Sequence, residues 1–576
     1  GGSQDSYSLF SLLLGPLVAT LPFAWTVPCI VLASLGCSAL AVFTLLHRML
    51  GGKPLVAALG LLAVMCVSPL YGGLRLFGYT EPFLTARTLA EPLLLWSLVP
   101  LAGGRLVRAT LLQLAALAFH PLMALPALVV TWLMACARNP RWLLLLAVPL
   151  LALASAATSP VPWRHRLLDT FDPDWWALVS QANVQVVLGN WRLADWATIA
   201  IDAGLIASVT LKLPRAAPRQ MLGSLLLAMA GLMTTALVAT DLLHWVLPTQ
   251  LQPWRVLWLV HLLAVGLAPW LVWQLWRPGG LSRMASALVV LALACSHVGS
   301  ASGAAVLAAW LLCEWAAWRR LAASTGLVRL VVTACLLAAI GLGAANLALE
   351  IERLHWHPTP TLTASMAARV FAEPVIAFAL VLSLAALSAR TALTAAAVAV
   401  SSLALLVFAA WHWDQRDALS RAIESTPTER PFQAQIPTHA SVFWPDHLHA
   451  TWGLLHRISH YERQQGAGMV FHRATAEIIG PRRDAYRRIR EEKESCEAGV
   501  WMSSGTAQDL AACQTPSNEK LRELCSGRER PDFLVFGTPA ARPLQAVATW
   551  DLGGQRLHLY RCSQFAGTGS DGQRAE

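Results

Sequence analysis

Residues 71–92 read YGGLRLFGYTEPFLTARTLAEP, a polar and charged stretch in a sequence that is otherwise almost continuously apolar. The stretch contains Glu81, Arg87 and Glu91. A charged side chain at the centre of a membrane helix costs about 2.5 to 3.5 kcal/mol on insertion scales, so such residues face a cavity, a partner or water. The stretch therefore predicts one wall of an active site, at one end of a bundle of membrane helices.

The composition predicts a polytopic α-helical membrane protein. The chain has 576 residues, of which 56% are hydrophobic and 13% charged, and its mean hydropathy is +0.52. Soluble domains carry about 25% charged residues. The net charge of +10 comes from Lys and Arg scattered in ones and twos between apolar runs. Nucleic-acid binding requires basic residues gathered on one face, so we expect no nucleic-acid partner.

The basic residues divide the loops into two classes. Basic loops lie at 47–53, 105–108, 138–141, 212–219, 277–283, 319–320 and 390, and longer loops with most of the acidic residues lie at 71–91, 158–194, 242–253, 296–303 and 351–367. By the positive-inside rule the first class is cytoplasmic and the second extracytoplasmic. With an interfacial helix over 6–22 and a first span over 25–46, we expect about 12 to 14 membrane helices, some of them short or re-entrant.

One apolar segment conflicts with a simple count of spans. Residues 111–136 are long enough for one span, but basic pairs flank both ends. A hairpin of two short helices turning at His120-Pro121 removes the conflict, because the residue before proline avoids helical dihedrals and proline lacks the N–H that would continue the helix. His120 would then lie on the same side as residues 71–92. The alternative is a single span kinked at proline.

The composition changes after a last span over 391–410. We predict a multi-spanning membrane domain over 1–411 and an extracytoplasmic α/β domain over 412–576. Short strands are predicted at 441–445, 532–537, 545–551 and 556–562, with a charged helix over 474–496. This domain holds an even number of cysteines outside apolar segments, which predicts two disulfides among three alternative pairings in an oxidising compartment. The four are Cys496, Cys513, Cys525 and Cys562.

Two carboxylates are candidates for a catalytic base at the outer face. Asp5 stands just before the first apolar helix, where it would take a proton from a hydroxyl at the membrane surface. Its alternative role is a helix N-cap. Glu81 precedes Pro82, which holds its backbone extended and keeps it out of a helix. Arg87 and Glu91, spaced i and i+4, either serve the site or pair with each other.

A short connection between two apolar segments collects further polar candidates. Residues 240–263 read TDLLHWVLPTQLQPWRVLWLVHLL and place Asp241, His244, Gln252 and Arg255 near the outer boundary. Arg255 would bind a phosphate with two parallel N–H donors. Its alternative role is that of an arginine at the membrane boundary whose guanidinium extends to the lipid–water interface.

Other acidic residues lie nearby in the sequence. The DxxDxD pattern of Asp169, Asp172 and Asp174 would either hold a divalent cation or start a helix, with Asp172-Pro173 as N-cap and first turn. Asp202, inside a span, is expected to face a cavity or a polar helix partner.

The whole arrangement resembles the bacterial GT-C superfamily of membrane glycosyltransferases. The shared features are many membrane helices, an acidic residue ahead of an interfacial helix, short re-entrant helices and an outer α/β domain at the C-terminus. The resemblance implies that Asp5 acts as base toward the acceptor and that Arg255 binds the donor phosphate, with Arg87 as a second phosphate ligand by our own interpretation. Glu81 is added from the residues themselves.

The resemblance further implies a bacterial inner-membrane enzyme with its C-terminal domain in the periplasm. It would transfer a sugar, with inversion, from a polyprenyl-phosphate donor to an extracytoplasmic hydroxyl. Its partners would be membrane lipid and the lipid-linked sugar. No metal ligands are assigned, and a divalent cation stays open as a cofactor. The alternatives are a transporter, for which the hairpin would be a broken helix, and a non-catalytic partner in envelope polysaccharide assembly.

Overall fold

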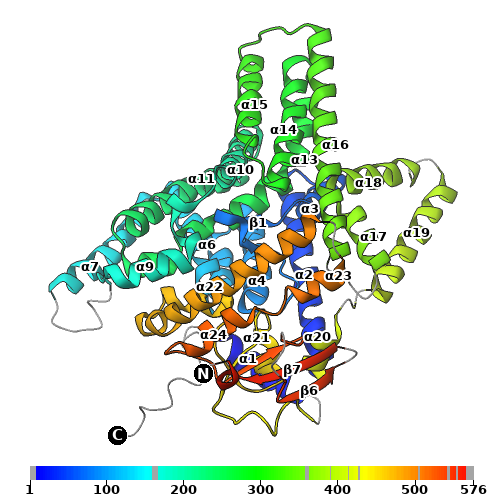
Figure 1. Ribbon diagram of the computed structural model, residues 1–576. Coiled ribbons are helices and arrows are strands. Elements are labelled where there is room, and N and C mark those ends of the chain that lie inside the picture. The colour runs from blue at the N-terminus through cyan, green and yellow to red at the C-terminus, as the bar shows by residue number, and fades with distance from the viewer. Residues whose placement is uncertain are drawn as a thin grey trace. The chain divides into compact units, whose positions relative to one another are not determined.

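The computed structural model describes ten stretches of the chain, and Figure 1 shows their arrangement. They are residues 8–158, 167–356, 362–388, 391–412, 414, 416–425, 429–503, 506–540, 545–552 and 555–565. The chain divides into two compact units, each described by itself below. The helical unit comprises Gly1–Phe171, Gln185–Glu352 and Thr363–Ala409, and the C-terminal unit comprises Asp172–Val184, Arg353–Leu362 and Ala410–Glu576.

The helical unit has the helices of a membrane protein. Within the described residues, eight segments are long and apolar enough to cross a bilayer. They are Phe23–Met49 (α2), Pro121–Arg138 (α6), Leu193–Lys212 (α10), Ala216–Leu242 (α11, Ala216–Ala236, with the turn after it), Val246–Trp276 (α12, Val246–Leu251, and α13, Leu257–Trp276), Gly280–Val298 (α14), Thr325–Leu354 (in α16, Thr325–Trp356) and Ala392–Trp411 (α19). The predicted class is confirmed, and the predicted number of crossings stays a prediction.

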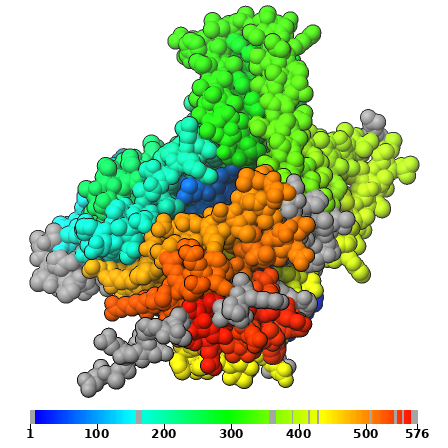
Figure 2. Space-filling model, in the orientation of Figure 1, coloured from blue at the N-terminus to red at the C-terminus, as the bar shows by residue number. Residues whose placement is uncertain are grey.

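Shorter helices complete this unit. They are Phe10–Thr20 (α1), Pro54–Cys66 (α3), Ala86–Ala102 (α4), Leu106–Phe119 (α5), Ala147–Thr158 (α7), Gly303–Trp318 (α15), Leu362–Ala372 (α17) and Pro374–Ser388 (α18). The last two are bent by 75° against each other, as in a broken span or a re-entrant loop. Parts of α14, α15 and α16 stand clear of the rest of the unit (Figures 1 and 2), and many large apolar side chains of α15 and α16 are exposed. Lipid is the solvent that suits such surfaces.

The predicted hairpin at His120-Pro121 is confirmed. Helix α5 ends at Phe119, His120 is extended with φ −146°, and α6 begins at Pro121. The two helices run back along each other, because Gln113 exchanges hydrogen bonds of 2.8 and 3.0 Å with Thr131 across the pair. At the open end, Arg138 Nη1 donates to the Gly104 carbonyl at 2.7 Å. The two basic pairs that flank the hairpin therefore lie at the same end.

The N-terminal part follows the sequence prediction, with α1 and α2 separated at Leu21 and Pro22. Just before α1, the chain is attached to the tip of the hairpin. The Ser8 hydroxyl donates to the Phe119 carbonyl at 2.7 Å, and the Leu9 N–H donates to the Ala118 carbonyl at 2.9 Å. Residues 8 and 9 are thereby fixed next to His120.

Helix α13 is the centre of the helical unit. It is apolar on all sides, and almost every residue from Leu257 to Leu271 is buried, as expected of a helix surrounded by others. Helix α3 packs closely against it. A Cβ atom added to Gly60 of α3 would lie 2.3 Å from the carbonyl oxygen of Gly266 in α13, so the two backbones approach where a side chain would not fit.

We expect Gly60→Ala to lower the thermal unfolding midpoint of the purified protein. Overpacking in a filled core typically costs about 1–3 kcal/mol, which outweighs the roughly 0.5–1 kcal/mol that alanine gains over glycine within a helix. Gly223→Ala in α11 is the matched control, because a Cβ there meets nothing within 4 Å. Equal midpoints for the two variants would contradict the close approach of α3 and α13.

The C-terminal unit is an α/β domain with a five-stranded mixed sheet in the order β4-β3-β5-β7-β6. The strands are Ser441–Phe443 (β3), Ile458–Ser459 (β4), Phe533–Phe536 (β5), Ala548–Leu552 (β6) and Gln555–Arg561 (β7). Strand β3 is parallel to β4 and β5, whereas β5, β7 and β6 pair antiparallel. All four predicted strands are confirmed, and β4, with two residues, was missed.

Helices cover both faces of this sheet. They are Pro173–Ala182 (α9), Ala418–Ser425 (α20), Leu448–Gly453 (α21), Arg473–Met502 (α22) and Asn518–Ser526 (α24), and a further helix, Ala507–Ala512 (α23), contacts α22. Alternate residues of β5 enter opposite cores, since Leu534 and Phe536 pack with α22 and α24 while Phe533 and Val535 pack with α20 and α21. All four are buried, which explains why β5 is a continuous apolar run.

The disulfides resolve the pairing that the sequence left open. Cys496 is bonded to Cys513, and Cys525 to Cys562. The unit also includes α9, which the sequence placed only in a long loop. Its Trp175 Nε1 donates to the Met469 carbonyl at 2.9 Å, and its Leu178 packs against Gly480 of α22. Asp172 caps α9 by accepting the Trp175 N–H at 3.1 Å, which confirms the helix-start interpretation of this residue.

Candidate functional site

The stretch 71–92 forms a compact loop before it enters α4. Leu70–Tyr71 (β1) pairs antiparallel with Phe77–Gly78 (β2), and a short turn lies between them. Leu74, Arg75 and Thr80 have positive φ values of 60°, 52° and 54°, a region that side chains other than glycine seldom adopt. Strain of this kind persists where surrounding contacts impose it, and it concentrates at functional sites.

Hydrogen bonds from other elements hold this loop in place. Asp195 of α10 accepts the Leu74 N–H at 3.0 Å, and Arg75 Nη2 donates to the His297 carbonyl at 2.9 Å. Glu91 of α4 receives the Thr80 N–H on both carboxylate oxygens at 3.0 Å. Of the two alternatives for Arg87 and Glu91, pairing with each other is therefore wrong, because Glu91 holds the loop backbone and Arg87 pairs with Glu81.

Glu81 is a mostly buried carboxylate of this loop, and Arg87 is its ion-pair partner. Arg87 Nη2 lies 2.8 Å from Glu81 Oε1, and the Thr85 hydroxyl donates to Glu81 Oε2 at 3.3 Å. Burial raises the pKa of Glu81 above its ordinary value, although Arg87 and Thr85 oppose the rise. Glu81 follows the strained Thr80 and precedes Pro82, so it lies in the loop before α4, and its carboxylate meets Thr85 and Arg87 at the start of that helix.

Arg255 reaches the same place from a distant part of the sequence. Its guanidinium carbon lies 4.3 Å from the centre of the Phe77 ring, and that of Arg87 lies 5.4 Å from the same centre. Gln252, with φ 48°, ends α12 and accepts the Arg255 Nε hydrogen at 2.7 Å. Two cations thus converge on one aromatic ring, which attracts cations to its face.

Both arginines carry buried N–H groups that no neighbour satisfies. Nη1 of Arg87 and Nη1 of Arg255 are buried without a hydrogen-bond partner in the described structure. The Tyr71 hydroxyl lies beside the Arg255 guanidinium and interacts with it. A buried donor without a partner costs about 1–3 kcal/mol, and more when the group is charged. Two such donors on adjacent cations suit an anion with several acceptor oxygens.

His120 belongs to the same cluster, as its predicted position suggests. It is the N-cap of α6, where its Nδ1 accepts the Met123 N–H at 3.2 Å, and it lies within electrostatic range of Arg255 and Arg87. The structure therefore brings together Glu81, Arg87, His120, Gln252 and Arg255. Asp5 lies outside the described residues.

The two remaining candidates shape the backbone. Asp241 accepts the N–H groups of Leu188 and Gly189 at 3.1 and 2.8 Å, which uses both of its oxygens. His244 has φ 49°, and its carbonyl accepts the Phe171 N–H at 2.8 Å. The side chain of Asp241 therefore fixes backbone, whereas the candidate role of the His244 side chain stays a prediction.

The sequence interpretation missed a buried polar chain beneath the loop. His261 of α13 lies with Nδ1 2.8 Å from Asp202 Oδ2 and with Nε2 2.9 Å from the Ser68 carbonyl. His297 Nδ1 accepts the Ser68 N–H at 2.9 Å. Asp202 therefore has the polar helix partner that was expected. The available signal for His261 was a single histidine in an apolar helix, which by itself does not identify its partner.

The described residues contain no group of three His, Cys, Asp or Glu side chains placed as metal ligands. In comparisons with protein families, with curated proteins and with solved structures, the chain has no match.

Proposed function

We propose that the chain is a membrane glycosyltransferase that transfers a sugar, with inversion, from a polyprenyl-phosphate donor to an extracytoplasmic hydroxyl. The membrane would be a bacterial inner membrane, with the site and the C-terminal unit on its periplasmic side. The observation that carries the proposal is the convergence of a carboxylate, Glu81, with two arginines whose buried Nη1 groups lack partners.

Each group would have one role in the transfer. Arg255 and Arg87 would bind the donor phosphate and stabilise the charge that grows on it as the bond to the sugar breaks. The acceptor hydroxyl would attack the anomeric carbon while a carboxylate takes its proton, and polyprenyl phosphate would leave. Glu81 is our candidate base. Asp5 is a second one, three residues before Ser8, which is attached to the hairpin beside His120.

A genetic experiment separates this function from its alternatives. Cells that lack the protein are complemented with the wild-type chain, Asp5→Asn or Glu81→Gln, and their envelope glycans are analysed by mass spectrometry. We expect the deletion to remove a sugar, the wild type to restore it and at least one substitution to fail. If both variants restore the glycan fully, the enzyme proposal is wrong and a role in assembly is favoured.

The transporter alternative draws on one observation, the 75° break between α17 and α18. Transporters use broken helices near the middle of the membrane to bind substrate. Transport of a glycan precursor in vesicles that is unchanged by both substitutions would favour this alternative.

A further inference from the structure

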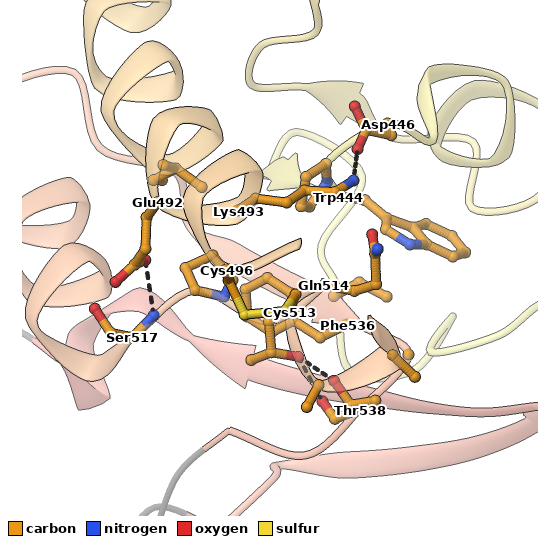
Figure 3. Close-up of a pocket in the computed structure, with 18 of the residues that line it drawn as sticks. Trp444, Asp446, Glu492, Lys493, Cys496, Cys513, Gln514, Ser517, Phe536 and Thr538 are labelled. Carbon is orange, nitrogen blue, oxygen red and sulfur yellow. Dashed lines mark hydrogen bonds and ion pairs between the residues drawn. A yellow bond between two sulfur atoms is a disulfide. The ribbon is translucent and has the colours of Figure 1, made fainter. Parts of the chain in front are cut away.

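The C-terminal unit contains a cavity of about 540 Å³ beside its sheet (Figure 3). Its walls include the residues that directly follow the parallel strands β3 and β5, among them Trp444, Asp446 and Thr538. In α/β sheets, ligands bind outside the carboxyl ends of parallel strands. The volume falls within the roughly 300–1,000 Å³ of small-molecule sites.

Covalent and ionic contacts fix the walls of this cavity. The Cys496–Cys513 disulfide joins α22 to the segment after α23, and both sulfurs lie in the lining. Asp446, with φ 64°, receives Lys493 Nζ at 2.6 Å and the Tyr486 hydroxyl at 2.7 Å. Although burial raises the pKa of Asp446, these two hydrogen bonds hold it below its ordinary value. The cavity is therefore formed before any ligand enters.

The charged groups in the described lining of the cavity are two carboxylates, Asp446 and Glu492, and one lysine, so their sum is negative. Lys493 is the one lysine or arginine among the described residues that line it, and Asp446 neutralises it. The N-terminus of α24 is capped by the Ser517 hydroxyl, which accepts the Lys520 N–H at 3.4 Å. The Ser517 N–H is itself donated to Glu492 at 3.1 Å. An anionic ligand would therefore meet Glu492 beside the N-terminus of α24 and Asp446 beside Lys493. These two carboxylates disfavour a phosphate.

The remaining polar groups of the lining are neutral and alternate with apolar surface. Gln514, held by a 3.0 Å hydrogen bond from its Nε2 to Glu497, extends beside Trp444 in Figure 3. The hydroxyls of Thr515 and Thr538, both in the lining, are hydrogen-bonded to each other. Ile489 and Phe536 add apolar surface. A sugar ring presents the complementary pattern, since its hydroxyls both donate and accept while its C–H faces are apolar.

We infer that this cavity binds an uncharged sugar unit. The inference rests on the C-terminal unit alone and does not depend on transfer chemistry in the helical unit. Binding would use the Gln514 amide, the outer oxygen of Glu492 and the threonine hydroxyls as hydrogen-bond partners. A soluble domain with this site would hold a segment of glycan in the compartment that it faces.

The test uses the full chain in phosphatidylcholine nanodiscs, because alkyl-glycoside detergents carry sugar headgroups of their own. Saturation-transfer NMR and calorimetry measure binding of neutral hexoses and their disaccharides, with glucose 6-phosphate and inorganic phosphate as anionic probes. We expect a neutral sugar to bind and Gln514→Ala to weaken its affinity about three- to tenfold, as for one lost hydrogen bond. Gln433→Ala is the matched control, since Gln433 is exposed in the same unit and does not line the cavity.

Three results would overturn the inference. The first is that no neutral sugar binds while thermal unfolding shows an intact protein. The second is preferential binding of the phosphate-bearing probes. The third is a sugar affinity that neither Gln514→Ala nor Glu492→Gln changes, which would place the bound sugar elsewhere in the chain. Loss of transfer activity with sugar binding retained would count against the proposed function and leave this site standing.

Discussion

Glu81→Gln should lower the rate of sugar transfer about 10²- to 10⁴-fold, the range that general-base catalysis contributes. Glutamine keeps the size of the side chain and an acceptor for the Thr85 hydroxyl, but it cannot take a proton from the acceptor. The measurement is the release of polyprenyl phosphate from a short-chain donor by the purified protein in nanodiscs.

The matched control is Glu352→Gln, an exposed glutamate of α16. Glu352→Gln should unfold at the same temperature as the wild type, whereas Glu81→Gln leaves the mostly buried Arg87 without its ion-pair partner and should also lower the unfolding midpoint. Transfer is therefore compared at a temperature at which both variants are folded. Transfer that survives in Glu81→Gln but disappears in Asp5→Asn would assign the base to Asp5.

The pH dependence of transfer should identify the same carboxylate. A base must be ionised, so kcat/KM falls as the pH drops through its pKa. Burial raises the pKa of Glu81 above the ordinary 4.5, so the acidic limb should lie above that pH. Arg87 lowers this pKa, and Arg87→Met should therefore move the limb to higher pH. A limb that Arg87→Met leaves in place would exclude Glu81 as the titrating base.

Arg255→Met should lower the rate of sugar transfer about 10²- to 10³-fold, the second large effect. This is the loss expected when one hydrogen-bond donor to the charge that develops in the transition state is removed. Methionine retains an unbranched side chain of similar length but cannot bind phosphate. Arg255→Lys should recover only a small part of the rate, because an ammonium lacks the planar pair of donors that the guanidinium presents.

The control for this loss is Arg329→Met, at an exposed arginine of α16. The effect of Arg255→Met should be largest when the donor concentration is low, since weaker phosphate binding raises KM as well as lowering kcat. Normal kinetics in Arg255→Met would show that the unpaired Nη1 atom does not mark a phosphate site.

The sequence predicted the elements that depend on neighbouring residues alone, through backbone restrictions, charge pattern and apolar runs. The hairpin at His120-Pro121 followed from the backbone limits of an X-Pro pair and from the charge at both ends of one apolar segment. Strand β5 followed from its apolar run. Strand β4 was missed because two residues, Ile458 and Ser459, are too few for any pattern.

The candidate site was predicted in its residue types more than in its contacts. Proline after Glu81 correctly kept that residue out of a helix. The partner of Arg87 could not be predicted, because helical spacing pointed to Glu91. In the structure, Glu91 accepts the N–H of Thr80, whose φ is positive, and Arg87 pairs with Glu81 instead. The meeting of Arg87 and Arg255 at Phe77 depends on tertiary packing, which no local pattern contains.

Helix α9 sets an order of events during synthesis of the chain. It is encoded between helices α7 and α10 of the helical unit, yet its Leu178 and Trp175 pack on α22 and its neighbours, which emerge from the ribosome nearly 300 residues later. At about 5–20 residues per second, translation leaves α9 without its partner for on the order of 15 to 60 s. During that interval its apolar face lacks the surface that buries it in the folded chain, so α9 can take its final place only after the C-terminal unit has been synthesised.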